Sequence, residues 1–162
     1  ALFHNRVRDA IQATDLGPNL AQNRNVGEIV YQGLDLGLRG RPAQRLELGA
    51  NYSWIDSDWR SSEAGVVTGL PRHKLFAWAD WQALEPLHLV LSGEARSRTY
   101  SDTGGSRRAA GFALLNLHGE YQASRELALS LALNNLADRR YAYNEGFIEE
   151  GRTLWLGMKY RY

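Results

Sequence analysis

The residues best suited to chemistry in this sequence are arginines and tyrosines in two polar segments. The first segment contains Arg96, Arg98, Tyr100, Arg107 and Arg108. The second contains Tyr141, Tyr143 and Asn144. A guanidinium group binds carboxylate, phosphate or catecholate oxygens through a planar fork of N–H donors. Both segments could therefore bind an anionic chelate, while the alternatives are contact with a phosphate-bearing surface or simple solvation of a loop.

The histidines lie on separate segments without the spacing of a metal site: His4, His73, His88 and His118. If segments 87–98 and 111–122 pair around a loop centred near residue 104, His88 comes close to His118 and Glu120. Imidazole and carboxylate groups can bind a transition metal. A hydrogen-bonded cluster explains the same residues more simply, so we expect no metal there.

Other polar residues give weaker signals. Asp56, Asp58 and Glu63 could hold a hard cation through oxygen, although a solvated loop is the simpler interpretation. Glu126 and Lys159 are expected to form a cross-strand ion pair. Cysteine is absent, no Ser–His–Asp set can be placed and the net charge is only +1. We therefore expect no enzyme activity, no cofactor and no nucleic-acid partner.

The elements that must position these residues are β-strands, because apolar side chains recur at every second position. In 127–133, for example, leucine occupies each odd position and small or polar residues lie between. The pattern predicts an all-β chain of about eight strands. Their expected ranges are 3–13, 29–39, 46–54, 74–83, 87–98, 111–122, 127–133 and 152–162.

The connections between these strands alternate strictly in length. Tight links fall at 40–44, 84–86 and 123–125, and two of them contain proline, which favours turns. Long polar connections fall at 14–27, 56–72, 99–109 and 136–150. An antiparallel up-and-down meander with short turns at one end and long loops at the other is typical of transmembrane barrels of the outer-membrane type.

The two strand faces also favour a membrane barrel over its rival, a soluble ligand-binding β-barrel. One face carries leucines, and the other carries too many charges to fill a dry core. Rings expected near the tight-turn end would form an interfacial girdle: Trp81, Tyr121, Tyr160 and Tyr162. No apolar run approaches the roughly 20 residues of a membrane-spanning helix. Outer-membrane lipid and lipopolysaccharide are then expected partners.

Four segments resemble the TonB-dependent receptor family. Asn134–Tyr141 is similar to the family's Asn-Leu-Phe-Asp-Lys-x-Tyr stretch, and Glu150–Tyr162 to its closing strand with a terminal aromatic residue. Gly69–Leu75 and Glu28–Leu36 are similar to two earlier strand entries, and all four occur in family order. The sequence departs from the family at Ala137, where Phe is usual, and at Glu150, where Pro is usual.

The resemblance implies a receptor in the Gram-negative outer membrane, with a barrel of about 22 strands and a plugged lumen. Residues 1–162 would form a single segment from the last part of that barrel, with no counterpart of the plug or of the TonB-contacting motif. It implies energised uptake of a ferric siderophore first, and of cobalamin or haem next. The remaining alternative is an independent eight-stranded barrel acting as an anchor, an adhesin or a small enzyme.

Orientation and assembly can also be predicted. The leucines expected to face lipid are Leu89, Leu129, Leu131, Leu154 and Leu156. Both termini should lie on the periplasmic side, with loops 56–72 and 136–150 outside. The resemblance further implies that the barrel-assembly machinery reads the last strand through Leu154, Leu156, Met158, Tyr160 and Tyr162. Alternatively, Tyr162 is one more girdle residue.

Overall fold

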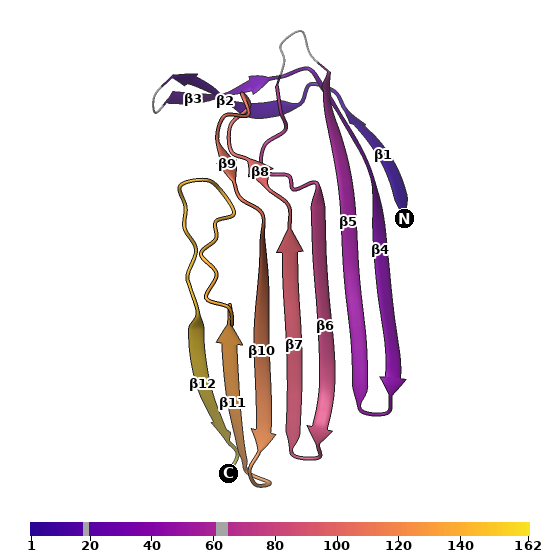
Figure 1. The fold of residues 1–162 in the computed structure, drawn as a ribbon, viewed down its shortest axis with the longest axis vertical. Coiled ribbons are helices and arrows are strands. Elements are labelled where there is room, and N and C mark those ends of the chain that lie inside the picture. The colour runs from indigo at the N-terminus through magenta and orange to yellow at the C-terminus, as the bar shows by residue number, and fades with distance from the viewer. Residues whose placement is uncertain (18–19, 61–64) are drawn as a thin grey trace.

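The computed structural model describes residues 1–17, 20–60 and 65–162, and its main feature is one eight-stranded antiparallel sheet (Figure 1). The strands of this wall follow the order β1-β4-β5-β6-β7-β10-β11-β12. Their bounds are β1 Leu2–Val7, β4 Glu28–Ala43, β5 Leu46–Arg60, β6 His73–Leu84, β7 Leu87–Arg96, β10 Phe112–Gln122, β11 Leu127–Asn134 and β12 Thr153–Tyr160. No helix long and apolar enough to cross a membrane occurs among the described residues.

Two small hairpins stand apart from the wall. The first pairs β2 (Ile11–Gly17) with β3 (Leu20–Asn25), and the second pairs β8 (Thr99–Tyr100) with β9 (Arg108–Ala109). We expected one strand over 3–13 and a loop over 14–27, and both expectations were wrong. The chain turns at Asp9, which has a left-handed φ of 54°, so β1 stops and a separate hairpin begins.

The register places the regularly spaced leucines on one face of the wall. Leu129 lies opposite Met158 and Leu131 opposite Leu156, while Gly119 lies between Leu131 and Leu89 in the same row. Directly opposed residues of antiparallel strands project to the same side. All five leucines predicted to face lipid therefore share one face, which we call the leucine face, and Leu156 is 77% exposed there.

The opposite face, which we call the polar face, carries a network of side-chain contacts. Ser53 donates a hydrogen bond to Asp35 at 2.6 Å, and Glu47 forms ion pairs with Arg39 and Arg41. Charged side chains that satisfy one another in this way belong on the wet interior of a barrel. The long connections also fold over the polar face, as described below.

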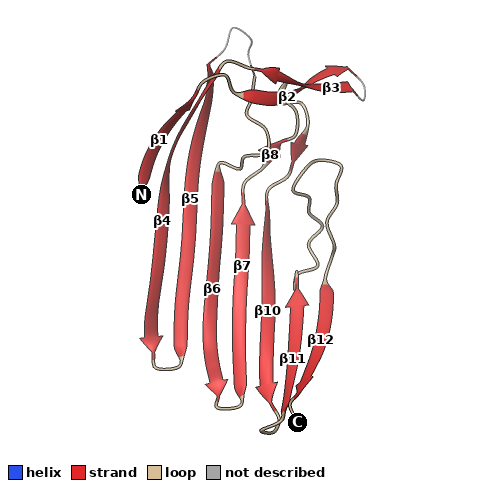
Figure 2. Cartoon of the chain, turned by 180° about the vertical axis from the view of Figure 1, so that it is seen from behind, coloured by secondary structure: helices blue, strands red, loops and turns tan. Residues whose placement is uncertain are grey.

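The connections are segregated as predicted. The tight links between β4 and β5, β6 and β7, and β10 and β11 all lie at one end of the wall, and the long connections lie at the other (Figures 1 and 2). The C-terminus lies at the tight-turn end (Figure 2). Ala1 instead lies partway along β4, where its amino group contacts the Asp35 carbonyl at 2.6 Å. β1 therefore starts midway along the wall and runs towards the long-loop end, and the periplasmic location of the two termini stays a prediction.

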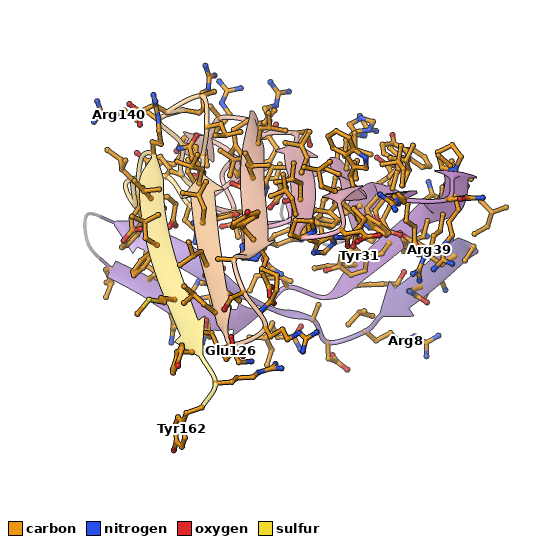
Figure 3. All side chains as sticks on the ribbon, turned by 90° about the horizontal axis from the view of Figure 1, so that it is seen from below. Arg8, Tyr31, Arg39, Glu126, Arg140 and Tyr162 are labelled. Atoms are coloured by element: carbon orange, nitrogen blue, oxygen red, sulfur yellow. The ribbon has the colours of Figure 1, made fainter. Side chains whose placement is uncertain are left out.

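The wall is open. Among the described residues, β1 and β12 form its two edges and do not pair with each other. An independent eight-stranded barrel would require that pairing, because closure is what removes the edges. The structure therefore does not support that alternative, and Figure 3 shows the open wall from below, with Tyr162 beyond the end of β12.

Candidate binding mouth at the long-loop end

A small hydrophobic core anchors the long connections to the polar face. It consists of Ala10, Val26, Ile29 and Val67, with Tyr31, Trp59 and Leu70 packed against it. Ile29 is fully buried and lies opposite Trp59 on the β4–β5 pair, and both residues are on the polar face. Burial of these apolar groups holds residues 67–70 against the end of β5. A cleft forms beside this core.

The cleft has a volume of 430 Å³ and lies between the end of β5, the 65–72 segment and the start of the β8–β9 hairpin. Its lining includes Trp59, Arg72, His73, Ser97, Arg98 and Tyr100. Two guanidinium groups, an imidazole and aromatic rings therefore border one space. This combination suits an anionic ligand that also carries flat rings.

The two arginines of the cleft differ in their partners. Arg72 donates to the Asp56 carboxylate at 2.6 Å, so much of its charge is already matched. Arg98 is exposed and forms no ion pair within the described part of the chain. The buried Trp59 indole nitrogen has no hydrogen-bond partner among the residues that the structure describes. Arg98 is therefore the cation of the cleft best placed to receive an incoming anion.

A second group of predicted residues forms an aromatic cluster beside β7, in which the rings meet tilted or edge to face. The Arg96 guanidinium lies 4.9 Å from the ring centre of Tyr143 and 5.8 Å from that of Phe112. Tyr141 also packs on Phe112, at 4.6 Å between ring centres. The Tyr143 hydroxyl donates to Glu94 on the polar face at 3.4 Å. A cation near the faces of two rings is stabilised by their quadrupoles.

The pKa values of both tyrosines of this cluster are raised. Burial first, and then the nearby carboxylate of Glu94, raise the pKa of Tyr143 above its ordinary value. Burial and the charges of Glu149 and Glu94 raise the pKa of Tyr141 likewise. At neutral pH both phenols stay protonated. They can donate hydrogen bonds or present ring faces, but they are poor phenolate ligands for a metal.

The segment that resembles the family's Asn-Leu-Phe-Asp stretch positions these tyrosines. Asn135 has a left-handed φ of 51° and is 3% exposed. Its side chain accepts from the Arg139 amide and donates to the Arg139 carbonyl, while its own amide donates to Asn116. Asp138 accepts a hydrogen bond from the Arg152 amide at 2.8 Å. These local hydrogen bonds hold the β11–β12 connection over the polar face.

The remaining predicted residues are divided between two places. Arg107 forms an ion pair with Glu145 at 3.6 Å. Arg108 lines a smaller cleft of 230 Å³ that also contains Tyr141. Asn144 is exposed, and its carbonyl accepts from the Phe147 amide. The eight predicted residues therefore occupy the same end of the wall, but not one common pocket.

One expected arrangement is confirmed and one expected ion pair is wrong. The predicted loop centre near 104 is correct, because Arg96 lies opposite Phe112 and His88 opposite Glu120, with His118 the next residue along the same face. The hydrogen-bond partner of the His88 ring is Asp80, at 2.6 Å. The expected Glu126–Lys159 pair is not formed. Lys159 lies opposite Ala128, and Glu126 instead accepts from the Ser124 hydroxyl.

The possible cation site is not formed by the residues that the structure describes. Asp56 is paired with Arg72 and Asp58 with Arg60, and Glu63 lies outside the described residues. Within the described ranges, no group of at least three metal-binding side chains comes together. Carboxylates that are already matched by guanidinium groups offer little to a hard cation.

Sequence reasoning missed Arg72 and Trp59 as members of the cleft. Arg72 belongs to Gly69–Leu75, whose resemblance to a strand entry of the family predicts no binding role, although the residue lines the cleft. The sequence predicts a loop at Trp59, whereas this residue lies near the end of β5 on the polar face. The pattern of 46–54 gives no signal for this extension, because its apolar residues occupy even positions, whereas Ile55 and Trp59 occupy odd positions and Asp56 and Asp58 take the even ones.

An open antiparallel wall with a leucine face, a polar face and long loops at one end defines a segment of an outer-membrane barrel. Residues 1–136 match the family model described as TonB dependent receptor-like, beta-barrel. The chain belongs to this family, which confirms the predicted fold class and the Gram-negative outer-membrane location.

Curated relatives and solved structures agree with this assignment. The chain is 24% identical over 158 residues to the probable TonB-dependent siderophore receptor PiuA of Acinetobacter baumannii, covering 85% of this chain and 21% of that protein. It is 30% identical over 152 residues to the ferric-pyoverdine M114 receptor PbuA of a Pseudomonas species, covering 86% and 18%. The chain thus spans about a fifth of the length of these relatives.

The crystal structure of the siderophore receptor PiuA from A. baumannii has a similar fold, with a TM-score of 0.80 and 20% identity, covering 99% of this chain and 25% of that one. The crystal structure of a ferric enterobactin receptor mutant from Pseudomonas aeruginosa gives a TM-score of 0.74 and 22% identity, covering 98% and 28%. The fold of this chain thus corresponds to about a quarter of each of these longer chains.

Proposed function

We propose that this chain forms part of the wall and the extracellular loops of a receptor that takes up a ferric siderophore, energised through TonB. The observation that carries this proposal is the cleft containing Arg98, which opens at the long-loop end beside the polar face of a TonB-dependent receptor wall. Relatives named as siderophore, pyoverdine and enterobactin receptors support the same solute class.

The side chains of the cleft and of the neighbouring aromatic cluster suit such a chelate. A ferric catecholate carries negative charge on oxygen and exposes flat rings, so it can accept from Arg98 and stack beside Tyr100. The protonated tyrosines near Arg96 would contact the ligand periphery and leave the iron with its chelator. The iron is cargo in this proposal, and the chain supplies neither a resident metal nor catalysis.

The proposal also assigns the other surfaces. The leucine face contacts lipid, and exposed arginines at the loop end contact lipopolysaccharide phosphates. β12 carries Leu154, Leu156, Met158 and Tyr160 in the leucine-face row, with Tyr162 beyond it, and presents this edge to the barrel-assembly machinery. Residues 1–162 act as one wall segment. TonB would engage a part of the receptor outside this segment.

Titration of the full-length receptor with ferric chelates tests the proposal. Arg98→Gln should weaken binding of a ferric catecholate by about tenfold, the effect of losing one charge-assisted contact of about 1.4 kcal/mol. Arg98→Lys should recover part of the affinity, because it restores charge without the planar fork. Arg8→Gln is the matched control, since Arg8 is exposed and does not line the cleft.

The same titration separates the alternative solutes. Cobalamin and haem serve as the second and third ligands, with a ferric hydroxamate as a less charged siderophore. Tight binding of cobalamin or haem alone, with Arg98→Gln equal to the unmodified receptor, would refute the siderophore assignment. Tight ferric-siderophore binding that is equal in Arg98→Gln would support the proposed function and contradict the assignment of the cleft as the ligand site.

A further inference from the structure

The long connections of this chain are joined to one another in series, and the β8–β9 hairpin is the central link. Loops of surface proteins are usually exposed and move independently. Here the hairpin contains Thr99, Asp102, Thr103 and Ala109 at 3%, 6%, 7% and 4% exposure. Such burial in a two-residue ladder requires neighbouring loops to cover it on both sides.

The hairpin is joined to the β5–β6 connection by backbone hydrogen bonds. The Val66 amide donates to the Thr103 carbonyl, and the Gly69 amide donates to the Tyr100 carbonyl, both at 2.9 Å. The Val66 side chain also borders Gly105, where an added Cβ would lie 3.4 Å away. Backbone partners of this kind fix both position and register.

The other side of the hairpin is joined to the β11–β12 connection. The Thr99 hydroxyl donates to the Tyr143 carbonyl at 3.3 Å, and the Glu145 amide donates to the Ser101 hydroxyl at 3.0 Å. The Arg107–Glu145 ion pair adds a third contact. Tyr143 is at the same time held by Arg96 on the wall.

The series continues to the first long connection. The Thr68 hydroxyl donates to the Gln12 side chain of β2 at 2.9 Å, and Val67 packs with Ala10 and Val26. The β2–β3 hairpin, residues 65–70, the β8–β9 hairpin and residues 141–148 thus form one chain of contacts across the long-loop end (Figure 1).

We propose that these four segments move as one cap, with the β8–β9 hairpin as the coupling element. Displacement of residues 141–148 is transmitted through Thr99 and Ser101 to Val66 and Gly69, and from there to Gln12. Displacement of one segment therefore changes access across the whole long-loop end of the wall. This coupling goes beyond the proposed function and does not depend on which solute the receptor binds.

Amide hydrogen exchange in the full-length receptor, without ligand, tests the coupling. Thr99→Val combined with Ser101→Ala removes both hydrogen bonds to residues 141–148 and leaves the Arg107–Glu145 ion pair in place. It should raise exchange of the Val66 and Gly69 amides by about fivefold, the factor expected from losing about one net hydrogen bond. Ser124→Ala in the β10–β11 turn removes a comparable serine hydroxyl at the other end of the wall and should leave these amides unchanged.

A milder substitution on the other side of the β8–β9 hairpin, in the 65–70 segment, provides a second measurement. Thr68→Val removes the contact to Gln12, keeps the side-chain shape and should raise exchange of the Glu145 amide by a similar factor. If each variant loosens only its own segment, the loops are independent and the proposal is wrong. If the full-length receptor shows this exchange coupling but binds no ferric siderophore, only the proposed function is contradicted.

Discussion

The indole ring of Trp78 occupies the space that a side chain at Gly49 would need. These residues lie directly opposite each other on β6 and β5, and a Cβ added to Gly49 would lie 2.5 Å from the ring. The Arg39 guanidinium also lies over the Trp78 ring, 5.8 Å from the ring centre. Gly49 and Trp78 thus pack as a pair on the polar face near the tight-turn end.

Gly49→Ala should therefore destabilise the barrel by about 1–3 kcal/mol, because the ring must leave a well-packed position. Gly40→Ala is the matched control, since nothing lies within 4 Å of a Cβ added there. Urea titration of the purified full-length barrel measures the change. If Trp78→Leu fails to recover stability in the Gly49→Ala background, the ring is not the cause.

Leu131→Arg should destabilise the inserted barrel by about 2–4 kcal/mol if the residue lies near the bilayer midplane, because the leucine face meets lipid. The adjacent Ala132 projects to the polar face, opposite Trp155, so Ala132→Arg should cost clearly less. Refolding equilibria of the two variants in lipid vesicles give the comparison. Equal costs at both positions would contradict the assignment of the faces.

The β8–β9 hairpin should loosen in acid because of Asp102. Burial alone would raise the pKa of this carboxyl, but hydrogen bonds from the Arg107 amide and from the Ser106 hydroxyl and amide lower it below its ordinary value. A lowered folded-state pKa gives stabilisation that is complete above the unfolded pKa, about 3.9, and is lost as the pH falls through the folded value.

Protection of the Ser106 and Arg107 amides, corrected for intrinsic exchange, should therefore fall as the pH drops from about 5 to below the ordinary aspartate pKa. Asp102→Asn should show reduced protection already at neutral pH and no further fall over that range. Ser124→Ala again serves as the distant control. A pH-dependent fall of the same size in Asp102→Asn would show that another group is responsible.

Deletion of Tyr162 should lower the amount of correctly inserted receptor in cells by more than the loss of one interfacial ring explains, which is about 1–2 kcal/mol at most. The physical reason is that β12 forms an open edge with a terminal ring beyond it, suited to pairing with an edge strand (Figure 3). Tyr121→Ala removes a ring of the same type at the same end and is the control. Equal insertion of both variants would show that Tyr162 is only an anchor.

Much of the wall could be predicted because a strand's period is local. The alternation in 127–133 and 152–162 needs no knowledge of the neighbours, and the tight links carry their own turn residues. From these features alone the strand count, the leucine face and the loop-end segregation follow. The predicted first strand, 3–13, is too long because the left-handed turn at Asp9 has no strong sequence signal.

The sequence by itself determined which side chains share a face and which end of the wall carries the arginines and tyrosines, because those properties follow from alternation and turn chemistry along one segment. Only the tertiary structure decided that Arg96 lies against Tyr143, that His88 contacts Asp80, and that Arg72 and Trp59 join Arg98 and Tyr100 at one cleft. These contacts depend on the register between strands and on how long loops fold over the polar face. Both are set by backbone hydrogen bonds and burial between residues far apart in the chain.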